Sequence, residues 1–108
     1  MPNIEVYGFV APHLDNIASE LAKTRAIQQK IYEHIEELPW ADEVVVTIID
    51  SASVDKKFNN FPFFRICSTD MEEINTLISK LEPIGYDMEW LLLTGFKPAK
   101  VGKIHGKK

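Results

Sequence analysis

One sequence feature constrains the fold of this chain more than any other: a strand pattern at the N-terminus that recurs sixty positions later. Both copies begin with proline and place apolar side chains at their third and fifth positions. The copies are Pro2–Gly8, with Ile4 and Val6 at those positions, and Pro62–Ser68, with Phe64 and Ile66. Each is followed by an amphipathic helix pattern and then by a run of bulky apolar residues. The repeat predicts two βαβ units in tandem.

The first unit is expected to span residues 2–50 and the second residues 61–96. In the first unit, a helix is predicted from an N-cap at Asp15 to about Leu38, where Pro39 stops it, and a strand over 43–50. In the second, a strand over 61–68 precedes a helix with a capping box of Thr69 and Glu72, and the last strand covers 88–94. The polar residues 51–60 are expected to form the connecting loop.

The order β-α-β-β-α-β predicts an α/β (α+β) two-layer sandwich, in which a four-stranded sheet carries both helices on one face. With 108 residues, the chain is expected to form a single domain over residues 1–96 with a basic C-terminal tail over residues 97–108. All 16 acidic residues lie at or before Glu89, whereas five of the 12 basic residues lie in the tail. A body this acidic is a poor nucleic-acid binder, and the tail is expected to be solvated and partly disordered.

The sequence also predicts the compartment and the absence of cofactors. The longest apolar runs, such as Val44–Ile49, are far shorter than the roughly 20 residues of a membrane helix, and Glu5 interrupts any signal peptide. Cys67 is the only cysteine, so neither an intramolecular disulfide nor a cysteine-based zinc cluster is expected. The three histidines lack the spacing of a metal site. We therefore expect a cytoplasmic protein with no metal, no cofactor and no membrane association.

The apolar strands indicate self-association. The strands predicted over 43–50 and 88–94 carry apolar residues on both faces, which is typical of strands buried from both sides. Two helices cover only one face of a sheet, so another copy of the chain is expected to cover the other face. The alternative is that the long loop and the tail fold over that face.

The tandem repeat, with Pro2 directly after Met1 at the start of the first strand, resembles the tautomerase superfamily in its two-repeat form. The resemblance implies a homotrimer whose sheets surround a central barrel, with a dimer as the next candidate. It also implies that the free amine of Pro2 is a general base, which moves a proton between carbon atoms of a small keto-enol substrate.

The chemistry of such a site suggests which residues accompany Pro2. An apolar wall disfavours the protonated amine and lowers its pKa, and Ile4, Phe58 and Phe64 are the expected wall. A substrate carboxylate favours a bidentate arginine. The family places arginines after the first strand and within the second, where this chain has His13 and valines. Arg25 and Arg65 are therefore the predicted substitutes, and His13 is a further substrate-binding candidate.

Other interpretations fit the same residues. A ferredoxin-like domain shares the element order and includes dimeric α+β barrels that bind small molecules; its strands would be interleaved rather than paired in tandem. A third possibility is a non-catalytic oligomeric protein of the tautomerase fold. Arg65 is expected to pair with Glu5 or Glu89 across the sheet if it has no role in binding. A separate alternative for Pro2 is that it only keeps the strand start off the hydrogen-bond ladder.

Overall fold

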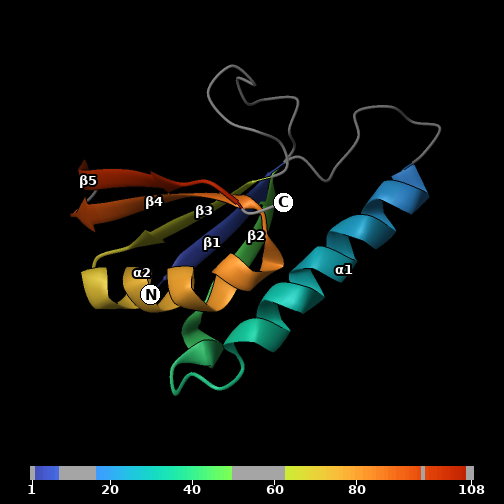
Figure 1. Cartoon of the computed structure of the whole chain (residues 1–108), viewed down its shortest axis with the longest axis horizontal. Coiled ribbons are helices and arrows are strands. Elements are labelled where there is room, and N and C mark those ends of the chain that lie inside the picture. The colour runs from blue at the N-terminus through green and yellow to red at the C-terminus, as the bar shows by residue number, and fades with distance from the viewer. Residues whose placement is uncertain (1, 8–16, 50–62, 96, 107–108) are drawn as a thin grey trace.

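The computed structural model describes residues 2–7, 17–49, 63–95 and 97–106, and the side chains of these residues except 17–24. They form one sheet and two helices, drawn in Figure 1. In chain order, the elements are β1 (Asn3–Tyr7), α1 (Ile17–Ile35), β2 (Val45–Ile49), β3 (Phe63–Ser68), α2 (Met71–Leu81), β4 (Asp87–Thr94) and β5 (Lys97–Ile104). Short 3-10 helices, Ala41–Glu43 and Glu82–Ile84, precede β2 and β4.

The strand order is β2-β1-β3-β4-β5. The strands of each repeat pair in parallel, β1 with β2 and β3 with β4, and the two repeats meet along an antiparallel contact between β1 and β3. The mixed α+β class is thus confirmed. The repeats pair in tandem, and the described strands show none of the interleaving expected of the ferredoxin-like alternative.

The prediction of four strands is wrong, because the lysine-rich segment forms a fifth. β5 pairs antiparallel with β4 after a turn at Gly95, whose φ of 65° suits a residue without a Cβ. The prediction of a disordered tail fails for this segment for a physical reason. Its lysines and Pro98 look unlike a strand, yet these residues are typical of an edge strand, because they discourage further pairing with other chains.

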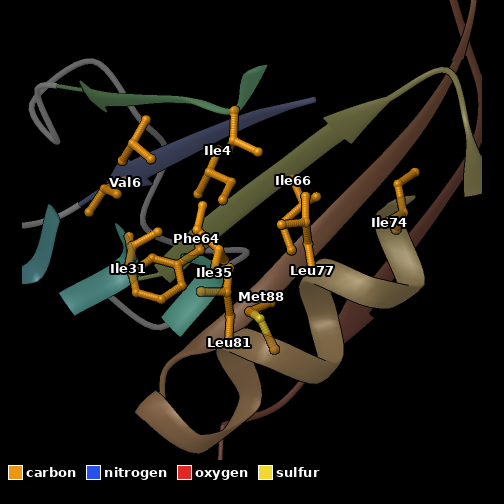
Figure 2. Packing of buried hydrophobic residues seen from close by; sticks show 12 residues of the cluster. Ile4, Val6, Ile31, Ile35, Phe64, Ile66, Ile74, Leu77, Leu81 and Met88 are labelled. Carbon is orange, nitrogen blue, oxygen red and sulfur yellow. The ribbon is translucent and has the colours of Figure 1, made fainter. Parts of the chain in front are cut away.

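Both helices pack on the same face of the sheet (Figure 1), as expected. Figure 2 shows the core between them, where side chains from α1 and α2 meet those from the central strands. Its fully buried members are Ile4, Val6, Ile31, Ile35, Phe64, Ile66, Ile74, Leu77 and Leu81. The alternation of β1 and β3 directs these residues toward the helices, so the neighbouring positions point to the other face. We call that other face the open face; most of its described side chains are partly or fully exposed, but Tyr7 and Phe63 on it are buried.

The helix ends differ in detail from the prediction. α1 ends at Ile35, and Asp15 lies outside the described residues. The N-cap of α2 is Asp70 rather than Thr69, because the Asp70 carboxylate accepts the backbone N–H of Glu72 at 2.9 Å. None of the described helices is both long enough and apolar enough to cross a membrane.

β2 is not buried from both sides within one chain. Val46 faces the core and is buried, whereas Val45 faces away from it and is 48% exposed. β4 is half-buried over most of its length. The loop predicted over 51–60 falls outside the described residues, and the single-domain assignment stays a prediction.

Candidate functional site

A row of charged side chains crosses the open face of the sheet. Strand register places Glu5 of β1 opposite Arg65 of β3, Arg65 opposite Glu89 of β4, and Glu89 opposite Lys103 of β5. Directly opposite residues of paired strands point to the same face, so these four form one line. We call them the charged row; the sign of the charge alternates along it.

Arg65 is the centre of a dense set of contacts in the charged row. Its Nε and Nη2 donate to Glu89 Oε2 at 3.1 and 3.0 Å, and its Nη1 lies 3.8 Å from Glu5 Oε1. Nη1 also donates to the Tyr7 hydroxyl at 2.8 Å, and that hydroxyl donates to Glu5 Oε1 at 3.1 Å. The predicted pairing of Arg65 with carboxylates across the sheet is therefore confirmed. The guanidinium is bound within its own chain by two carboxylates.

The tyrosine of this network is held in its neutral form. Tyr7 is buried, and its ring stacks on Phe63 with centroids 4.6 Å apart. Burial and the charge of Glu5 raise the pKa of the Tyr7 hydroxyl to about 12, although the charge of Arg65 opposes this shift. The neutral hydroxyl can therefore both accept from Arg65 and donate to Glu5.

Two other groups on the open face, Arg65 and Cys67, also have shifted pKa values. Burial alone would lower the pKa of Arg65, but its hydrogen bonds to Glu89 and the charges around it raise that pKa instead. Burial and the charge of Glu5 raise the pKa of the Cys67 thiol, which makes the thiolate scarce. Cys67 is half-buried and is expected to be a poor nucleophile.

A second row, largely apolar, runs parallel to the charged row two residues away along the strands. Register places Val45, Asn3, Cys67, Leu91 and Val101 side by side from β2 to β5. The two ends of this apolar row are open, since Val45 is 48% and Val101 is 61% exposed. Within it, the buried Oδ1 of Asn3 has no hydrogen-bond partner among the described residues.

Pro2, the predicted base, lies at the start of β1, at the boundary between the two repeats. Its carbonyl accepts the backbone N–H of Val45 at 3.2 Å, and its side chain is fully buried. Continuing the alternation of β1 places Pro2 on the same side as Ile4, toward the helices. Met1 lies outside the described residues.

The other predicted site residues do not gather around Pro2 within one chain. Arg65 faces the open side, and Phe64 is a core residue opposite Val6, about 13 Å along the strand from Pro2. Arg25 is exposed on α1, one turn before Gln28, whose side chain donates to the Val46 carbonyl. His13 and Phe58 lie outside the described residues. The structure therefore brings none of the described candidates into contact with Pro2.

Sequence reasoning missed the roles of Tyr7 and Lys103. Tyr7 lies two residues after Glu5 in β1, so the period of two was a signal that could have found it, whereas Lys103 lies in a strand that its sequence does not indicate. It also missed a hollow of about 340 Å³ between the end of α2 and the end of β5, which includes Glu82, Tyr86 and His105 in its lining. In the described part of the chain, no group of three or more His, Cys, Asp or Glu residues is arranged to hold a metal ion.

Comparisons with known proteins give no further assignment. The chain matches no family model, no curated protein and no solved structure.

Proposed function

We propose that the chain is a tautomerase-type isomerase, in which the amine of Pro2 is the general base acting on a small keto-enol substrate. The observation that carries this proposal is the pairing of the two repeats. Each repeat forms a parallel pair, and the first strand of one lies antiparallel to the first strand of the other, with Pro2 at the start of β1. This arrangement supports the tautomerase-like layout over the ferredoxin-like one.

The surroundings of Pro2 suit a base that must be neutral before it reacts. Its side chain is enclosed by protein, and a buried amine is held in its uncharged form because burial penalises the cation. Removal of Met1 would leave a secondary amine there. That amine would take a proton from a carbon next to the substrate carbonyl and return it to another carbon, so the reaction is an isomerisation without net oxidation.

The closed contacts of Arg65 restrict how a substrate would bind. The guanidinium is occupied by Glu5 and Glu89 and faces away from Pro2, so it does not bind a substrate at the Pro2 of its own chain. The proposed substrate is therefore recognised by groups other than Arg65 of the same chain, with Arg25 and His13 as the remaining cationic candidates. The proposal includes assembly into a homo-oligomer, a trimer first and a dimer next, and a cytoplasmic location.

A second candidate is favoured by the same contacts. If Arg65 is purely structural and Met1 is retained, Pro2 carries an ordinary amide nitrogen and the protein is a non-catalytic oligomer of this layout. The state of the first residue separates the two candidates.

The experiment has two parts, run on the same purified protein. Intact-mass spectrometry establishes whether Met1 is absent. Ketonisation of an enol such as phenylenolpyruvate is then followed for the wild type, for Pro2→Ala and for Pro98→Ala, a proline variant on the exposed edge strand. We expect loss of Met1, and a rate that Pro2→Ala abolishes and Pro98→Ala preserves. Retention of Met1, or equal rates for wild type and Pro2→Ala, would remove Pro2 from the mechanism.

A further inference from the structure

The open face carries two rows with different chemistry, and their order restricts what can cover them. The charged row reads Glu5, Arg65, Glu89, Lys103 from β1 to β5, with charges of alternating sign. The apolar row, two residues along the strands, carries the exposed Val45 and Val101 at its ends. A partner for this face must match both rows at once.

We propose that the open face binds the open face of a second copy of this chain, with a twofold axis parallel to the strands that passes between β3 and β4. This pairing does not depend on whether Pro2 is a base. It favours the dimer over the trimer that the family resemblance places first, and it specifies the interface and the symmetry of that dimer.

The symmetry follows from the order of the charges. In the second copy, a twofold axis parallel to the strands reverses the order of the strands, but each residue keeps its position along the strand direction. Glu5 then faces Lys103 of the second copy, and Arg65 faces Glu89 of the second copy. Every charge meets its opposite, because an alternating row of four becomes its own complement when reversed. A twofold axis across the strands would instead place Glu5 on Glu5 and Arg65 on Arg65.

The same operation matches the apolar row. Because each residue keeps its position along the strands, the apolar rows of the two copies overlap from β1 to β5, with Leu91 across from Cys67 and Val101 across from Asn3 of the second copy. Val45 of β2 lies beyond this overlap. Sheets that pack face to face lie about 10 Å apart, with their strands about 30° from parallel. Near the axis, the side chains of both rows are long enough to meet across this distance. The pairing would withdraw Val101, the most exposed apolar side chain described on this face, from water.

The accessibility of the row members agrees with this assignment. In one chain, the side chains of Glu5, Arg65 and Glu89 are 23%, 28% and 17% exposed, so each has surface that a second copy can contact. Lys103 is exposed at the outer end of the row, where a long side chain can reach across the interface. The charged row is therefore able to form charge pairs with another copy, although the stacked aromatic pair beside it on the same face is buried within one chain.

The test uses charge-reversed variants of the full chain and analytical ultracentrifugation. In Glu5→Lys alone, two lysines face each other at both ends of the dimer, and in Lys103→Glu alone, two carboxylates do. We expect each variant to dimerise at least tenfold more weakly than wild type. When the two variants are mixed, the lysine introduced at position 5 of one faces the glutamate introduced at position 103 of the other. The remaining pair at the opposite end is native, so a heterodimer with near wild-type affinity is expected.

Two further variants keep the test decisive. Val101→Lys changes only an exposed residue of an edge strand, and it is expected to weaken the dimer at least tenfold even if Glu5→Lys fails to fold. Glu37→Lys is the control for Glu5→Lys, because it reverses the same charge on the helix side of the sheet, where Glu37 is 81% exposed. It is expected to leave the affinity of the dimer unchanged. A monomeric or trimeric wild type, a mixture of the two variants that fails to associate when both are folded, or an unaffected Val101→Lys would each overturn the proposed pairing. A trimer would leave the proposed isomerase intact.

Discussion

Breaking the ion pair between Arg65 and Glu89 tests the energetics of the charged row. A double-mutant cycle of Arg65→Met and Glu89→Gln isolates the interaction, since two guanidinium nitrogens share one carboxylate oxygen at 3.0 and 3.1 Å. Exposed ion pairs contribute at most about 1 kcal/mol, whereas removing one partner of a buried pair costs about 3–5 kcal/mol. With 28% and 17% exposure, this pair lies between these limits, and we expect a coupling energy of about 1–2 kcal/mol.

The chain offers a matched control. Lys80 and Glu37 form an ion pair with Nζ and Oε2 3.4 Å apart, but Glu37 is 81% exposed. The cycle of Lys80→Met and Glu37→Gln should give less than about 0.5 kcal/mol, and salt should weaken it further. Free energies of unfolding are measured by urea denaturation at a protein concentration low enough that the chain is monomeric, because Arg65 and Glu89 also lie in the proposed interface and self-association would otherwise contribute. A coupling energy for Arg65 and Glu89 no larger than the control would contradict the account of the row.

Three further outcomes follow from the geometry. In the folded protein the pKa of Tyr7 is raised to about 12, so the stability that its neutral hydroxyl contributes is full below pH 10 and is lost as the pH rises toward 12. In urea titrations, the free energy of unfolding of the wild type should fall by about 2 kcal/mol more than that of Tyr7→Phe between pH 10 and pH 12. A Cβ on Gly102 would overlap the Trp90 indole, so Gly102→Ala should destabilise the fold by about 1–3 kcal/mol and alter Trp90 fluorescence, and unchanged stability and emission would argue against this packing. Asp70→Ala should cost about 1 kcal/mol in thermal unfolding and Thr69→Ala much less, whereas the reverse order would return the cap of α2 to Thr69.

The sequence predicted the parts of the fold that follow from periodicity. The repeat around Ile4 and Phe64 marks two core strands, and the helical spacing that ends in Ile31 and Ile35 marks the side of α1 that packs on them. The pairing of Arg65 with Glu89 was also predictable, because strand residues on the same face meet across the ladder.

Other features depended on tertiary context. β5 was missed because its lysines, Pro98 and Gly102 have low strand propensity, and only its position beside β4 makes it a strand. The cap of α2 was placed one residue early because Thr69 and Asp70 are both good capping residues, and local geometry decides between them. Phe64 and Arg65 cannot both face Pro2 within one chain, since they are neighbours in sequence and must point to opposite faces of β3.

The central claim, that a second copy covers the open face, is tested most directly by the reactivity of Cys67. This single cysteine lies in the apolar row, so its thiol reports on that face alone. The rate at which a maleimide labels it is measured across protein concentrations that span the association seen by ultracentrifugation. The account predicts that labelling slows as the mass rises toward twice the 12.3 kDa of the chain. A rate that stays constant while the mass doubles would place the interface elsewhere and contradict the claim.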